Sequence, residues 1–174
     1  MTEWKTDIAS SGEDAVIRGV DLENVMEMDF VEAIWLLLRG EKPSENESKM
    51  FNTILSSSID HGVGNPSTVS ARTVQSGGND MNTSVAAGIL ALGDSHGGAI
   101  EEGMNMLQSN ETAEDIVSEH LEEDKKIPGL GHKVYDDRDP RAQRILDRAE
   151  ELGISGQNVK KMMEIQQKFA DEKL

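Results

Sequence analysis

Three of the four histidines in this chain lie directly beside glycine. They occur in the pairs His61-Gly62, His96-Gly97 and Gly131-His132. An imidazole exchanges a proton near neutral pH, and glycine allows the backbone to come close to a ligand. The repeated pairing predicts one shared site that binds a small molecule and moves protons. Taken singly, His61 fits equally a histidine that packs at a helix end.

The segment from Asp94 to Ala99 places His96 just before the expected start of a helix. The positive end of a helix dipole would keep the ring neutral, which suits the donation of one hydrogen bond to a carbonyl oxygen. The alternative is a loop histidine whose ring is satisfied by backbone groups. His120, in an acidic helix without a neighbouring glycine, is expected on the surface.

The run from Gly129 to Arg141 is the most specific stretch of the chain. Its glycines free the backbone to approach a flat or anionic group. Arg141 lies in the first turn of a helix opened by Asp139-Pro140, where a guanidinium beside free N–H groups can receive a carboxylate. The alternative for the charged residues from Asp136 to Asp139 is an exposed, salt-bridged turn.

The elements that must position these residues are mostly helices. A weak alternation over residues 4–20 predicts a short N-terminal hairpin. Helical spacing, caps and breakers predict the remaining elements, and Met81–Leu92, apolar nearly all round, is expected to be a central buried helix. The expected helices are 22–28, 30–38, 44–55, 66–76, 81–92, 99–107, 111–123 with Asn110 as its cap, 140–152 and 157–173. All three glycine-flanked histidines fall in the loops at 61–65, 93–98 and 126–139.

Composition excludes several classes of protein. The formal net charge of −16 argues against nucleic acid and anionic membranes as partners. No apolar run approaches the roughly 20 residues of a membrane span, and the N-terminus lacks the pattern of a signal peptide. Without cysteine, and without a His-x-x-x-His pair, no metal site is expected. These features favour one cytoplasmic domain over residues 1–174.

Three ordered segments carry a family resemblance: Gly129–Tyr135 with Asp139-Pro140-Arg141, Leu92–Ala99, and Ile59–Gly62. Together they resemble the motifs of the citrate synthase family. The first histidine comes early in the chain, and this compact build is most similar to the short citryl-CoA lyases. The resemblance implies a citrate synthase-like helical fold, with the short N-terminal hairpin ahead of it.

The resemblance also implies roles for the site residues. His96 would hydrogen-bond the thioester oxygen of the acetyl group, and His132 would assist proton removal at the oxygen that becomes the oxaloacetate carbonyl. His61 would bind a carboxylate or hydroxyl of the citryl group, and Arg141 would clamp a carboxylate.

Coenzyme A, as part of the substrate, would lie along the backbone of the glycine-rich run. The residues implied for its adenine are Pro128, Gly129, Leu130 and Gly131. Many relatives carry a base where this chain has Asp136, so Lys133 or Arg138 would meet a phosphate instead. No tightly bound cofactor or metal is expected.

The implied reaction is the cleavage of citryl-CoA to acetyl-CoA and oxaloacetate. The alternatives are a citrate synthase-type acyl transfer in the opposite direction, and a non-catalytic remnant that binds CoA or citrate. The family's catalytic aspartate is expected in an Asn-x-Asp segment beyond residue 174, so the C-terminal catalytic-aspartate segment is absent. The family also implies a homodimer or higher oligomer, for which Met81–Leu92 and the Met104, Met106 and Leu107 face are candidates; an ordinary core within one chain is the alternative.

Overall fold

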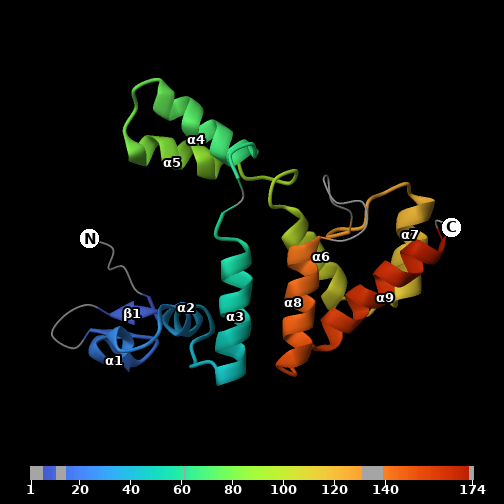
Figure 1. Ribbon diagram of the computed structural model, residues 1–174, viewed down its shortest axis with the longest axis horizontal. Helices are drawn as coiled ribbons and strands as arrows, with labels where there is room; N and C mark the ends of the chain where they lie inside the picture. Colours follow the sequence, from blue (N-terminus) through green and yellow to red (C-terminus); the bar gives the residue numbers. More distant parts are fainter. Residues whose placement is uncertain (1–5, 11–14, 61, 131–138, 173–174) are drawn as a thin grey trace. The chain divides into compact units, whose positions relative to one another are not determined.

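The computed structural model describes residues 6–10, 15–60, 62–130 and 139–172, and its fold is mostly helical, as the sequence predicts (Figure 1). The helices are α1 Leu22–Met26, α2 Phe30–Arg39, α3 Glu45–Ser57, α4 Pro66–Ser76, α5 Met81–Leu90, α6 Ala99–Gln108, α7 Ala113–Glu122, α8 Pro140–Glu151 and α9 Gln157–Glu172. Within the described residues, no helix is both long and apolar enough to cross a membrane.

Local capping signals explain where several helices begin. Ser44 and Glu47 form the expected capping box at the start of α3: the Ser44 side chain accepts from the Glu47 N–H, and the Glu47 carboxylate accepts from the Ser44 N–H. The Asn65 side chain accepts from the Thr68 N–H at the start of α4, with Pro66 as the first helical residue. These starts confirm the prediction.

The predicted start of α7 is wrong. Thr112, not Asn110, is the N-cap, because Thr112 and Asp115 form a reciprocal capping box that fixes Ala113 as the first residue. Asp21 and Asp29 do occupy the N-cap positions of α1 and α2, although neither side chain makes a cap hydrogen bond.

The predicted hairpin is the first part of a three-stranded antiparallel sheet. Its strands are β1 Ala9–Ser10, β2 Val16–Ile17 and β3 Val20–Asp21, in that order. Arg18 and Gly19 connect β2 to β3 with φ of 48° and 75°, as a two-residue turn with positive φ at both positions requires. The Arg18 Nε–H donates to the Leu37 carbonyl at 2.9 Å, which ties this turn to the end of α2.

The chain divides into two compact units. The first comprises Met1–Ile59 and Pro140–Ile154, and the second Asp60–Asp139 and Ser155–Leu174. The assignment of one domain to residues 1–174 stays a prediction.

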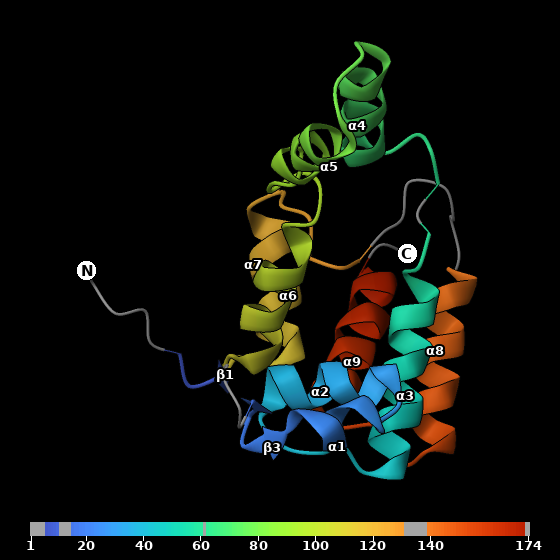
Figure 2. The same ribbon diagram turned by 90° about the vertical axis from the view of Figure 1, so that its left-hand side faces the viewer.

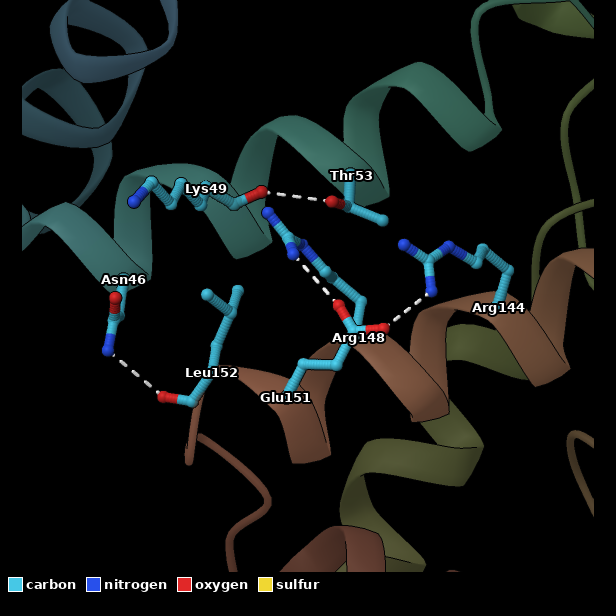
Figure 3. A network of polar contacts seen from close by, with 7 residues as sticks. All are labelled: Asn46, Lys49, Thr53, Arg144, Arg148, Glu151 and Leu152. Atoms are coloured by element: carbon cyan, nitrogen blue, oxygen red, sulfur yellow. Dashed lines mark hydrogen bonds and ion pairs between the residues drawn. The ribbon is translucent and has the colours of Figure 1, made fainter.

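In the first unit, α3 and α8 lie side by side, and one hydrogen bond links α3 to the residue that follows α8 (Figure 3). The Asn46 side chain donates to the Leu152 carbonyl at 3.0 Å. Arg144 and Arg148 each donate to one oxygen of Glu151, at 2.9 and 2.8 Å, and these two bonds lower the pKa of that carboxyl group. The buried apolar residues of this unit are Val25, Leu36, Met50 and Ala149.

In the second unit, α4 packs along α5, and α9 packs along α7 and α6 (Figure 2). A core of buried aliphatic residues lies between α7 and α9. Its members are Ala113, Ile116, Val117, Ile127 and Ile165, with Met106, Leu107, Leu130 and Phe169 packed against them.

The expectation that residues 81–92 form a central buried helix is wrong for this chain. The buried residues of α5 are Ser84 and Gly88, which face α4, whereas its large apolar side chains are exposed. Met81 is 78% exposed, Val85 52%, Ile89 62% and Leu90 85%. Burial on α5 is therefore limited to the narrow face that carries its small residues.

Candidate active site

His96 lies in a tight loop between α5 and α6. The Gly93 N–H donates to the His96 carbonyl at 3.1 Å, and the His96 and Gly98 N–H groups both donate to the Gly93 carbonyl, at 2.8 and 3.2 Å. Gly97 has a φ of 106°, which a residue with a side chain rarely adopts. These bonds fix the backbone of His96 immediately before the N-terminus of α6, as predicted.

Gly98 leaves no room for a side chain. A Cβ atom there would lie 2.5 Å from the Cα and 2.6 Å from the carbonyl oxygen of Asp94. The backbone torsions of Gly98, φ −64° and ψ −30°, suit any residue, so the requirement for glycine is purely steric. Gly93 differs, because a Cβ atom there would meet nothing within 4 Å.

The ring of His96 is held by a serine on α4. Its Nε2 lies 3.0 Å from Ser67 Oγ, and Ser67 Oγ lies 2.7 Å from Asn65 Oδ1. The orientation of the Asn65 amide follows from two neighbours: Nδ2 donates to the Gly62 carbonyl at 2.8 Å, and Oδ1 accepts from the Thr68 N–H at 2.9 Å.

This chain of contacts assigns the protons. Asn65 Oδ1 can only accept, so the single hydroxyl proton of Ser67 is donated to it, and the Ser67 oxygen accepts from the Nε2–H of His96. Among the described residues, none hydrogen-bonds the other ring nitrogen, Nδ1. The relay thus orients the imidazole through Nε2.

Ser67 and Asn65, which form a chain of hydrogen bonds with the His96 ring, were not predicted from the sequence. Asn65-Pro66 indicated only the start of a helix. The contact between His96 and Ser67 joins residues 29 apart in the sequence, and no periodic pattern predicts it. The one available signal was that Asn65, as an N-cap, places Ser67 in the first turn beside its side chain.

The first residues expected to bind CoA form a turn anchored in the core. The Leu130 N–H donates to the Ile127 carbonyl at 3.1 Å, with Pro128 and Gly129 between them, and Gly129 has a φ of 82°. Proline followed by a glycine with positive φ is typical of a type II turn. Ile127 is 2% exposed, and Leu130 packs against the same core, so both ends of the turn are held.

Helices α6 and α9 both pack against this turn. A Cβ atom on Gly129 would lie 3.3 Å from Met162 Cε of α9, and one on Gly103 of α6 would lie 3.9 Å from Pro128. Lys161 joins the same two helices, because its ammonium group donates to the Met106 and Ser109 carbonyls at 3.1 and 3.0 Å. The helix that follows His96 and the turn that begins the glycine-rich run are therefore parts of one packed assembly.

Arg141 is half-buried in the first turn of α8, as predicted. It belongs to the other compact unit from His96, so its place in a shared site rests on the resemblance alone. The remaining predicted site residues, His61, Gly131, His132, Lys133 and Arg138, lie outside the described residues.

His120 is more enclosed than expected. It is half-buried on α7, and its Nδ1–H donates to the Ile116 carbonyl at 2.7 Å. The neighbouring Glu123 is bonded to Lys125, which lowers the pKa of the carboxyl group and raises the pKa of the amine. Among the described residues, no three histidine or carboxylate side chains gather closely enough to hold a metal ion.

Comparison with known proteins identifies the fold and its relatives. Residues 15–173 match the family model described as "Citrate synthase, C-terminal domain". The citryl-CoA lyase from Hydrogenobacter thermophilus superposes with a TM-score of 0.91 at 44% identity, over 98% of this chain and 69% of that chain.

Citrate synthases are similar in sequence. Citrate synthase 2 of Bacillus subtilis is 40% identical over 119 residues, which are 66% of this chain and 32% of that protein. The citrate synthase of Deinococcus radiodurans is 34% identical over 148 residues, which are 83% of this chain and 37% of that protein. The chain thus spans about a third of the length of these relatives.

Proposed function

The chain belongs to the citrate synthase family, and from this premise we propose that its protein cleaves citryl-CoA to acetyl-CoA and oxaloacetate. The observation that carries the proposal is the likeness to a citryl-CoA lyase at 44% identity over 98% of the chain. At this coverage the alignment includes α4, α5 and the His96 loop.

The proposed reaction needs charge to be stabilised at two places. The tertiary hydroxyl of the citryl group loses its proton, and its oxygen forms the new carbonyl of oxaloacetate. The carbon–carbon bond breaks, and its electron pair passes to the acetyl fragment as a thioester enolate. A proton then adds to that carbon to give acetyl-CoA. Hydrogen-bond donors fixed before the reaction lower the cost of both charges.

His96 would stabilise the enolate oxygen from Nδ1. In the unliganded relay the proton is on Nε2, so donation from Nδ1 needs the other tautomer. Ser67 allows the change, because a rotation of its hydroxyl turns the proton from Asn65 toward His96 Nε2. Ser67 would then be a positioning residue that selects the form of the ring.

The other predicted residues complete the proposal. His132 would assist loss of the hydroxyl proton, while His61 and Arg141 would hold the carboxylates of the citryl group. The turn at Pro128 and Gly129, continued by Leu130 and Gly131, would carry the adenine of CoA, and Lys133 or Arg138 would meet a phosphate. CoA enters and leaves as part of the substrate, with no tightly bound cofactor, and we propose a cytoplasmic enzyme.

The alternative is the condensation of acetyl-CoA with oxaloacetate, which the names of the sequence relatives favour. Both directions use the same enolate, so one pair of assays on the intact protein separates them. Oxaloacetate formed from citryl-CoA is followed by its reduction with malate dehydrogenase. CoA released from acetyl-CoA and oxaloacetate is followed with a thiol reagent. The lyase proposal is supported if oxaloacetate is released from citryl-CoA much faster than acetyl-CoA and oxaloacetate condense. Condensation that is much faster than cleavage contradicts it.

A histidine outside the site provides the control. His96→Ala should lower turnover on the order of 10²-fold, the usual cost of losing one oxyanion donor. His120→Gln, on α7, should leave it unchanged. If the wild-type protein binds CoA by calorimetry but turns over neither substrate, the binding-only alternative holds instead.

We further propose that the exposed face of α5 contacts a second copy of the chain. Met81, Val85 and Ile89 recur at helical spacing on α5, and Leu92 follows the helix. Each is more than half exposed, and residues 81–93 contain no charge in a chain of net charge −16. Ile100 and Met104 of α6 are exposed as well, whereas Met106 and Leu107 pack against the core of their own unit.

The oligomeric state tests this face. Val85→Glu should convert a dimer to a monomer in sedimentation velocity experiments, because it places a carboxylate at the centre of the face. The control is Met163→Glu on α9, at a residue that is 52% exposed. Val159 of α9 is half-buried and therefore less suitable for a change to glutamate. A wild-type monomer at all concentrations would contradict the proposal.

A further inference from the structure

Gly88 of α5 lies against Ser67 of α4, the residue that holds the His96 ring. Gly88 of α5 is buried, and a Cβ atom there would lie 3.1 Å from the Ser67 carbonyl oxygen and 3.3 Å from Ala71 Cβ. Both distances are tighter than ordinary van der Waals contact. The missing side chain of Gly88 therefore sets how near α4 can come to α5.

A second contact joins the two helices near the turn that connects them. One turn before Gly88, the buried Ser84 side chain donates to Gln75 Oε1 at 2.8 Å. The pair is thus fixed near its connecting turn by a polar bond and at its open end by close approach. The open end is where Ser67 lies.

The two ends of the His96 relay come from these two helices. Ser67 is in the first turn of α4, and the His96 loop begins three residues after the end of α5. The 3.0 Å bond between His96 Nε2 and Ser67 Oγ therefore spans the separation that Gly88 controls. We propose that Gly88 is a positioning residue for His96: its lack of a side chain lets α4 approach closely enough for Ser67 to orient the imidazole.

The inference predicts a specific consequence of one added methyl group. In Gly88→Ala the new atom presses on the carbonyl of Ser67, and α4 must shift by a few tenths of an ångström at that residue. The hydroxyl of the same residue then withdraws from His96. Alanine is otherwise the better helix former, so the backbone propensity of α5 improves rather than suffers.

The rate test rests on the proposed function. Gly88→Ala and Ser67→Ala should each lower kcat/KM for citryl-CoA on the order of tenfold, since each misplaces one hydrogen-bonding group. In the double variant the loss should equal that of Ser67→Ala alone, because both changes remove the same bond. Losses that multiply would overturn the proposal.

A second readout does not depend on the reaction. In ¹⁵N-histidine spectra of the intact protein, Gly88→Ala should shift the ring signals of His96 and leave those of His120 unchanged. If the rates of all proteins are zero but this shift occurs, only the proposed function fails. Unchanged His96 signals in Gly88→Ala would overturn the positioning role.

The matched control is a glycine away from the site. Gly156→Ala, just before α9, adds the same methyl group where nothing lies within 4 Å, so the His96 signals and kcat/KM should stay as in the wild type. If Gly88→Ala does not fold, Gly88→Ala with Ala71→Gly removes one of the two close contacts. That variant should show a smaller shift of the His96 signals than Ser67→Ala, and a shift of equal size would count against the proposal.

Discussion

The α4–α5 pair and the α6–α7–α9 group belong to the same compact unit, yet they are packed in opposite ways. Ile165, Ile116 and Val117 are at most 2% exposed where α7 meets α9. Where α4 meets α5, the buried residues are Ser84 and Gly88. The first contact is filled by large aliphatic side chains, and the second depends on their absence.

The two kinds of contact should respond to opposite substitutions, one affecting stability and the other the positioning of the site. A core of aliphatic side chains is destabilised when atoms are removed, because a truncation leaves a cavity. A contact between small residues is destabilised when atoms are added, because a backbone is already at contact distance. His96 and Ser67 belong to the second kind of contact, so the site should be more sensitive to added methyl groups than to removed ones.

The largest effect on stability should come from the aliphatic core. Ile165→Ala should lower the free energy of unfolding by about 2–5 kcal/mol, since Ile165 is 0% exposed and its truncation leaves a cavity. Ile89→Ala, at a residue 62% exposed on α5, should change it by about 0.5 kcal/mol or less in a monomeric sample. Urea unfolding measures both. Equal losses would break the comparison between the two regions.

The largest effect on activity should come from an added methyl group beside His96. Gly98→Ala places a Cβ atom 2.5 Å from the Asp94 backbone, so the loop must move and carry His96 with it. Turnover of citryl-CoA should fall on the order of 10²-fold.

The control for Gly98→Ala lies in the same loop. Gly93→Ala adds its methyl group where nothing lies within 4 Å, so turnover should stay close to that of the wild type. A similar loss in both variants would mean that loop flexibility, not steric contact, controls the site.

A smaller effect on stability is expected when the N-cap residue of a helix is replaced in either region. Thr112 caps α7 beside the core, and Asn65 caps α4 beside the site. Replacement of either by alanine should cost about 1 kcal/mol of stability, because one backbone N–H loses its partner. Only Asn65→Ala should also lower turnover, since Asn65 caps the helical turn that holds Ser67 beside His96. Turnover that falls equally in Thr112→Ala would contradict the assignment.

Much of the fold could be predicted because its signals are local. Ser44 with Glu47, and Asn65 with Thr68, determine helix starts through contacts between residues three apart. The burial of α5 could not be predicted in the same way. Periodicity shows that a helix is apolar but not which neighbour it meets, and here the neighbour α4 requires Gly88 and Ser84 rather than Ile89.

In the candidate site too, the features with local signals could be predicted and those formed by tertiary packing could not. The position of His96 before α6 and the turn at Pro128 and Gly129 follow from glycine and proline in the sequence. The role of Ser67 does not, because its hydroxyl meets His96 only after two helices have packed. A relay between distant residues is a product of tertiary packing, whereas each of its members looks ordinary in the sequence.

The smallest effect concerns the pH dependence of stability on the core side. The side-chain and backbone hydrogen bonds from Thr112 lower the pKa of Asp115 below its usual value. A carboxyl group whose pKa is lower in the folded state stabilises the protein above its unfolded pKa, about 3.9, and loses that contribution as the pH falls through the folded value. The wild-type protein should therefore be more stable than Asp115→Asn at neutral pH, and the difference should vanish in acid.

Thermal unfolding followed from neutral pH into acid compares the wild-type protein with Asp115→Asn directly. A stability difference that persisted unchanged in acid would contradict the capping box as its source, because the bonds from Thr112 favour the charged carboxylate of Asp115.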